Sequence, residues 1–145
     1  MKRFLYIIIG VTLLLTSCDK ETSDNGKLDG FWQITKMIPS KATSSSSDMR
    51  TSGITWAFQG HILELRDVNK VHQDIVMSFT REGNKLILSV PYKVDRDADD
   101  VLLEDAELLM PYGITHVNET FEISELSNER MVLSNVDMYL IFRKY

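Results

Sequence analysis

The stretch 75–90 reads IVMSFTREGNKLILSV and contains two runs in which every second residue is apolar. A period of two is typical of a β-strand with one apolar and one polar face. Between the runs, Glu82-Gly83-Asn84 has the composition of a hairpin turn. The stretch therefore predicts an antiparallel hairpin, whose apolar face is expected to carry Ile75, Met77, Phe79, Leu86, Leu88 and Val90.

The same alternation recurs on both sides of this hairpin. Further strands are expected at 31–38, 54–58, 63–65, 121–123, 131–133 and 138–142, and on the first of them Trp32, Ile34 and Ile38 share a face. Most connections are short and rich in Gly, Asn and Asp, which excludes the long crossovers that parallel neighbours need. A meander of this kind leaves no free edge if it closes on itself. The sequence predicts an all-β fold, an eight-stranded antiparallel up-and-down β-barrel.

Two segments interrupt the strands. Residues 39–53 contain four consecutive serines and are too polar for a core element, so they form either a disordered insertion or a compact loop. Residues 97–110 place their apolar residues at helical spacing, carry acidic residues at the start and are followed by Pro111-Tyr112-Gly113. We expect one short helix here, between the fifth and sixth strands, packed on the barrel or covering one end.

The first residues have the organisation of a signal peptide: MKR, then an apolar run at 4–15, then Leu15-Thr16-Ser17-Cys18. As a helix the run would reach about 18 Å, which is too short to cross a hydrocarbon core of about 30 Å. The last four residues resemble the bacterial lipoprotein cleavage pattern, in which Cys18 becomes the first mature residue and carries acyl chains such as palmitate. Two or more chains anchor a protein stably. The alternative is a secreted protein whose single cysteine stays free.

These observations divide the chain into a signal peptide at 1–17, a lipidated flexible tether at 18–27 and a barrel domain at 28–145. Without Lys2 and Arg3 the chain keeps 14 basic and 21 acidic residues, and this acidity argues against a nucleic-acid partner. The expected partner is the membrane, through Cys18. The acidic tether resembles the export signals of surface-displayed Bacteroidetes-type lipoproteins. The alternative is a plain solvated spacer, which would have the same composition. We expect a bacterial outer membrane lipoprotein, either periplasmic or surface-exposed.

Gly30-Phe31-Trp32 matches the G-x-W pattern of lipocalins and related calycins, and the last strand ends on Arg143 and Lys144. The whole mature chain resembles the lipocalin-like domain of small Bacteroidetes lipoproteins. The resemblance implies that Trp32 closes one barrel end against a basic residue of the last strand, Arg143 or Lys144, and we assign the pair to Trp32 and Arg143. The position of the expected helix departs from the lipocalin pattern, since typical lipocalins carry their helix after the eighth strand. The resemblance therefore informs the fold more than the ligand.

The sequence contains few motifs that would indicate catalysis or metal binding. His61, His72 and His116 do not have the spacing of a zinc site, although His72 and Asp74 would share the polar face of one strand. The chain has no nucleophile-elbow, metalloprotease or phosphate-loop motif. The acidic residues at 95–107 lack the glycine and terminal glutamate of a calcium-binding EF-hand loop. We predict neither an enzyme, nor a cofactor, nor a metal site.

The remaining candidate is the apolar strand face. An eight-stranded barrel either fills its interior with side chains or holds one small ligand; large aromatic residues favour filling, and methionines favour adaptability. Our first hypothesis is a lipid-anchored module for a small hydrophobic or amphipathic ligand, with the loop 39–53 as a lid. The alternative is a packed structural or protein-interaction lipoprotein with an envelope protein as partner. The ligand-lining residues of the first hypothesis are Trp56, Phe58, Met77, Phe79 and Phe121.

Overall fold

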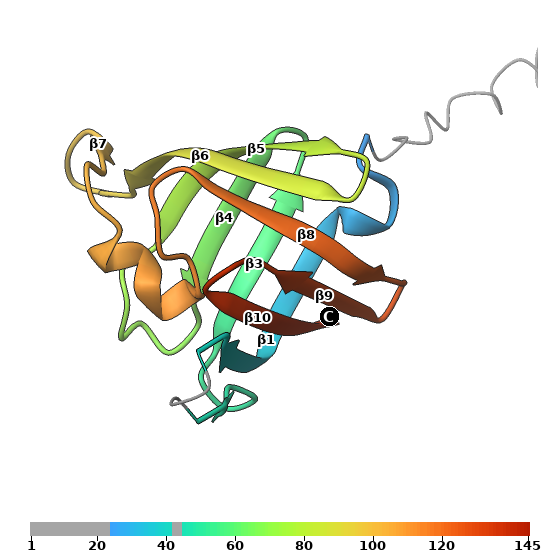
Figure 1. Ribbon diagram of the computed structural model, residues 1–145. Coiled ribbons are helices and arrows are strands. Elements are labelled where there is room, and N and C mark those ends of the chain that lie inside the picture. Colours follow the sequence, from blue (N-terminus) through green and yellow to red (C-terminus); the bar gives the residue numbers. More distant parts are fainter. Residues whose placement is uncertain (1–23, 42–44) are drawn as a thin grey trace, which may run out of the picture.

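The computed structural model describes residues 24–41 and 45–145, so the predicted signal peptide, Cys18 and most of the tether lie outside the described residues. Eight antiparallel strands form a closed barrel in chain order (Figure 1), and the last strand pairs with the first. This confirms the predicted eight-stranded antiparallel barrel. The barrel strands are β1 Gly30–Pro39, β3 Ile54–Gln59, β4 Ile62–Asp67, β5 Ile75–Glu82, β6 Lys85–Lys93, β8 Glu119–Leu126, β9 Arg130–Ser134 and β10 Met138–Lys144.

Two strands of two residues each extend the sheet outside the barrel. β2, Ser47–Asp48, pairs with β1, and β7, Val101–Leu102, pairs with β6. β2 belongs to the segment that the sequence predicted as a loop or lid. Its neighbour Met49 donates its backbone N–H to the oxygen of Thr35 and packs against the core. The described part of this segment is therefore attached to β1.

The β5–β6 hairpin forms as predicted, with Phe79 opposite Leu88, but Val90 does not join the apolar face. Between β5 and β6 the register shifts, so that Val90 and Pro91 together oppose Met77. An extra residue of this kind is a β-bulge, which reverses the inward and outward alternation beyond it. Val90 takes a φ of 53° and is 44% exposed, while Pro91 turns inward and is buried.

A second bulge changes the first strand in the same way. Trp32 and Ile34 are fully buried as predicted, but the pairing with β10 shifts between Ile34 and Lys36. The inward position therefore falls on Met37, which is buried, and Ile38 is only partly buried. The prediction that Ile38 shares the inner face is wrong because the extra residue moves it out of register.

A short helix lies between the fifth and sixth barrel strands, as predicted, but its bounds and type differ from the helix expected at 97–110. It is η2, a 3-10 helix at Glu107–Tyr112, and the residues before it contain β7. The aspartates at 95–100 bind backbone groups: the N–H of Asp97 donates to Asp95 Oδ1 at 3.0 Å, and that of Asp95 to Asp100 Oδ1 at 3.2 Å. Aspartate side chains that capture nearby backbone donors compete with helix formation. Here they stabilise a loop.

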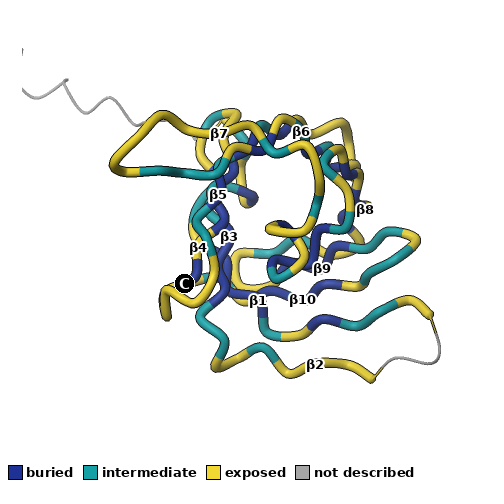
Figure 2. The backbone as a smooth tube through the Cα atoms, turned by 90° about the vertical axis from the view of Figure 1, so that its left-hand side faces the viewer, coloured by how far each residue is buried: buried dark blue, intermediate teal, exposed yellow. Residues whose placement is uncertain are grey.

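The core is one cluster of apolar side chains inside the barrel, and the buried stretches of the strands surround it (Figure 2). Trp56 lies within it, and the centroid of its ring is 6.0 Å from that of Phe121 and 5.1 Å from that of Phe142, both edge-on. The rings of Phe58 and Phe79 meet edge to face at 5.0 Å. Such pairs contribute about 0.5–1.5 kcal/mol beyond the area that they bury.

The chain covers both ends of this core. At one end, η2 buries Leu109 and Tyr112, and the Trp56 Nε1–H donates to the backbone oxygen of Tyr112 at 3.2 Å. At the opposite end lies η1, a 3-10 turn at Gly26–Leu28 (Figure 1). There the Trp32 Nε1–H donates to the oxygen of Leu28 at 2.8 Å. Across the described residues we find no helix with the length and apolar character to traverse a membrane.

Candidate functional site

The five residues predicted to line a ligand site all lie together in the barrel interior. Each is at most 2% exposed, and Trp56 contacts Phe58 and Phe121 through its ring, as Phe58 does Phe79. Phe79 alone among the five also lines one of the three clefts described below. The interior therefore has the packed character that the sequence left open as an alternative.

The basic residue at the closed end is Lys144 and not Arg143. Lys144 is paired directly with Trp32 in the β1–β10 register, and its Nζ lies 4.9 Å from the centroid of the Trp32 ring. The same Nζ donates to the oxygen of Lys27 at 2.8 Å. Successive strand residues point to opposite faces, so Arg143 projects outward and donates to Gln33 Oε1 at 2.8 Å. The pairing of Trp32 with Arg143 is corrected accordingly.

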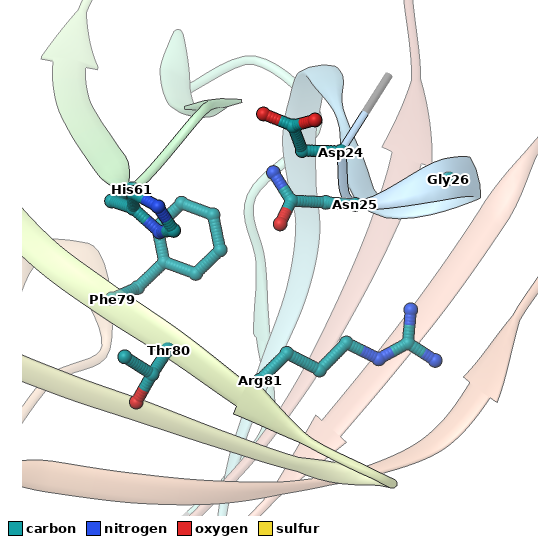
Figure 3. Close-up of a pocket in the computed structure, with 7 residues that line it drawn as sticks. All are labelled: Asp24, Asn25, Gly26, His61, Phe79, Thr80 and Arg81. Carbon is teal, nitrogen blue, oxygen red and sulfur yellow. The ribbon is translucent and has the colours of Figure 1, made fainter. Parts of the chain in front are cut away.

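A cleft of about 510 Å³ opens beside η1, at the end of the barrel where the described chain begins. In Figure 3 the rings of His61 and Phe79 lie on one side, and Asp24 and Asn25 lie on the other. The Arg81 side chain extends from β5 toward the N-terminal segment. The residues that line the cleft are Asp24, Asn25, Gly26, His61, Phe79, Thr80 and Arg81.

Hydrogen bonds hold the two sides of this end cleft in place. Asn25 donates from Nδ2 to the oxygen of Gly60 at 2.9 Å, which ties the N-terminal segment to the β3–β4 turn. The N–H of Phe79 donates to the oxygen of His61 at 3.0 Å, which ties the same turn to β5. The cleft is thus formed by three segments that are far apart in the sequence.

The end cleft combines an apolar surface with charged groups. Phe79 lies on the apolar side of the cleft with a ring that is 1% exposed, and its contact with Phe58 makes it part of the buried aromatic cluster. Arg81 donates from Nε to the oxygen of Gly83 at 3.0 Å, and a guanidinium group has further N–H donors for a bound acceptor. No group of three histidine, cysteine or acidic residues in the described segments could hold a metal ion.

The other two histidines, His72 and His116, lie outside the end cleft. The backbone N–H of His72 donates to Asp67 Oδ2 at 3.0 Å, while the carboxylate of Asp74 accepts from Lys70 at 3.0 Å. The expectation that His72 and Asp74 share the polar face of one strand is wrong, because both lie in the β4–β5 loop before β5 begins. His72 lines a cleft of about 280 Å³ there. His116 Nδ1 lies 3.2 Å from Glu119 Oε2, just before β8.

A third cleft, of about 260 Å³, lies on the outer face of β1, β3 and β4. Sequence reasoning missed it, although Phe31 stands next to Trp32 and must point to the opposite face. The pKa of Arg66 is raised by its hydrogen bond to Glu64 and by the attraction between their charges. The residues that line this outer groove are Phe31, Thr55, Ala57, Glu64, Arg66, Val68 and Tyr145.

Comparison with known proteins gives one family and two structures. A family model described as a lipocalin-like domain matches residues 13–145. A lipocalin-like protein from Bacteroides uniformis superposes with a TM-score of 0.60 at 19% identity, over 83% of this chain and 100% of that one. An uncharacterized protein from Bacteroides eggerthii gives a TM-score of 0.53 at 15% identity, over 81% and 99%. No curated protein matches the chain.

Proposed function

The chain belongs to the lipocalin-like domain family, whose model covers most of its length, and we propose that it is a lipid-anchored envelope lipoprotein that binds a small amphipathic ligand. The lipocalin-like fold is typically a binding fold rather than a catalytic one. The observation that carries the proposal is the end cleft of about 510 Å³. Small-molecule sites have volumes of roughly 300–1,000 Å³ and combine apolar walls with a few polar groups.

The chemistry of the end cleft suggests how such a ligand would bind. Its apolar part would lie on the Phe79 side of the cleft, against a ring that is 1% exposed, and its acidic or hydrogen-bond-accepting head would meet Arg81 and His61. The other predicted ligand residues would then act indirectly. Phe58 supports the Phe79 ring from the interior, and Trp56 supports Phe58 in turn.

The proposed lipid anchor would place this cleft close to a membrane. Asp24 lines the cleft and follows Cys18 by six residues. Six extended residues span at most about 20 Å. The ligand would thus bind near the surface of the outer membrane, on its periplasmic or outer side. Cys18→Ser should release the protein from the membrane fraction of its native host, and retention of this variant would contradict the anchor.

The ligand proposal can be tested with 4-phenylbutyrate, which combines an apolar ring with a carboxylate, and saturation-transfer NMR. We expect Arg81→Gln to weaken binding by about 10- to 100-fold, because a hydrogen bond to a charged group contributes roughly 1.5–3 kcal/mol. Arg96→Gln is the matched control, since Arg96 is an exposed arginine outside this cleft. Equal affinities for the two variants, or no binding by the wild type, would reject the end cleft as the site.

A second candidate function is favoured by the packed interior. If the barrel holds no ligand, the protein is a structural or interaction lipoprotein whose outer face or loops meet an envelope protein. Site-specific crosslinking in intact cells should then give one defined adduct that depends on the position of the crosslinker. Failure to obtain such an adduct from positions on several faces would count against this second function.

A further inference from the structure

The outer groove on β1, β3 and β4 is separate from the end cleft, with which it shares no lining residue. We propose that this groove is a second binding site, which takes a small planar aromatic ring without net charge. Four observations carry the inference: the floor of the groove, its aromatic walls, its neutral charge and its size.

The floor of the outer groove is formed at Ala57, a small residue between larger neighbours. In the register of the sheet, Phe31 lies opposite Ala57, and Ala57 lies opposite Glu64. Side chains directly opposite each other are about 4.5–5.5 Å apart at Cβ, so the methyl group of Ala57 leaves a hollow between its neighbours. The next row continues this floor with Thr55, which is 6% exposed and donates from Oγ1 to the oxygen of Arg66 at 3.2 Å.

Two aromatic rings border the hollow and are open to solvent. Phe31 is 56% exposed and Tyr145 is 72% exposed. The N–H of Tyr145 donates to the oxygen of Phe31 at 3.0 Å, which fixes the last residue of the chain beside the first strand. Single exposed apolar residues are ordinary on protein surfaces. Two rings around one hollow are the arrangement that a flat ligand needs.

The charges of the groove select the class of ring. Arg66 and Glu64 are hydrogen-bonded to each other, and together they carry no net charge. A charged ligand would therefore gain little here, whereas a neutral aromatic ring can stack on Phe31 or Tyr145 and on the plane of the guanidinium group. An aliphatic compound of the same size could use only the apolar contact.

Size argues for a small molecule rather than a protein. A stable protein partner usually covers about 800 Å² and 20–30 residues on each side, whereas seven residues line this groove. Its volume of about 260 Å³ is just below the range of drug-sized sites, which suits a single ring system.

Indole is a suitable probe, and its binding can be followed in ¹H–¹⁵N NMR spectra of the full chain with its tether. We expect saturable shifts at Ala57 and Arg66, and weaker binding of cyclohexylmethanol, which is similar in size but not aromatic. Ala57→Leu fills the floor and should weaken indole binding at least tenfold. Phe31→Leu should also weaken it several-fold, whereas Tyr139→Leu, which removes an exposed ring elsewhere, should have no effect.

Each other outcome overturns the inference. Equal binding of cyclohexylmethanol would reject the aromatic class, and shifts confined to His61 and Arg81 would place indole in the end cleft instead. Unchanged binding in both Phe31→Leu and Ala57→Leu would reject the groove. Arg81→Gln should leave indole binding intact, so failure of the end cleft and failure of the outer groove can be told apart.

Discussion

Replacing Gly113 with alanine tests how tightly η2 closes its end of the barrel. Gly113 follows η2 directly and has a φ of 82°, in the left-handed region. A Cβ atom at this position would lie 2.6 Å from Leu140 Cδ2 and 3.0 Å from Leu140 Cδ1. Leu140 is fully buried, so its side chain can move away only by repacking against other core residues. Gly113→Ala should therefore strain both the backbone and the core.

The expected cost has two parts. A left-handed conformation costs a residue with a Cβ atom roughly 1–2 kcal/mol, and overpacking of a core typically costs about 1–3 kcal/mol more. Gly113→Ala should thus lower the free energy of unfolding by about 2–5 kcal/mol. Gly83→Ala isolates the backbone part, because Gly83 has a φ of 63° and no atom within 4 Å of the added Cβ. This control should cost only about 1–2 kcal/mol.

Urea unfolding followed by far-UV circular dichroism measures both variants. The steric part can also be removed directly: in a Leu140→Ala background the two clashing carbons are absent, so Gly113→Ala should cost no more than Gly83→Ala does. If Gly113→Ala in the wild-type chain is as mild as Gly83→Ala, the close contact between the end of η2 and β10 does not exist in solution.

Two further predictions concern buried polar groups. Burial raises the pKa of Tyr112, and the charges of Asp74 and Asp67 raise it further. The folded state then holds the phenol proton more tightly than the unfolded state, so the stability that Tyr112 contributes should be constant below about pH 10 and be lost above it. Between about pH 10 and 11 the urea midpoint should therefore fall more steeply in the wild type than in Tyr112→Phe, a variant that should cost about 1 kcal/mol near pH 8 by losing the 2.7 Å bond to Gln73. Asp67 is 1% exposed and accepts three backbone N–H groups, so Asp67→Ala should cost at least about 2 kcal/mol, whereas Asp48→Ala on the surface should leave the urea midpoint unchanged.

The strands were predictable because each has a period-two pattern with one apolar face, and short turns allow only antiparallel neighbours. The bulges at Val90 and after Ile34 could not be predicted. An inserted residue does not disturb the apolar and polar alternation of its own strand, and it becomes apparent only in the register with the neighbouring strand. The helix between the fifth and sixth strands was predicted too long, for another reason. Residues 97–110 have helical spacing, but the aspartates at their start accept hydrogen bonds from the backbone, and the spacing of apolar residues does not reveal that competition.

The clefts were harder to predict than the fold. Inward-facing aromatic residues have the same sequence pattern in a filled barrel as in a hollow one, so Trp56 and Phe121 were equally consistent with core and with ligand contacts. The end cleft joins three distant segments at Asn25, His61 and Arg81, and no motif connects them. The outer groove depends on Ala57 lying opposite Phe31, a relation that exists only in the register of the folded sheet.

Gly30, Phe31 and Trp32 connect the closed end of the packed barrel with the groove on its outer face. Trp32 points inward and closes the core under Lys144. Gly30 leaves room for that lysine, since a Cβ atom there would lie 3.1 Å from Lys144 Cε. Phe31 points outward and borders the groove. Because strand residues alternate, the strand that places Trp32 in the interior also places the Phe31 ring on the outer face, so the closed core and the outer groove both depend on the same three residues.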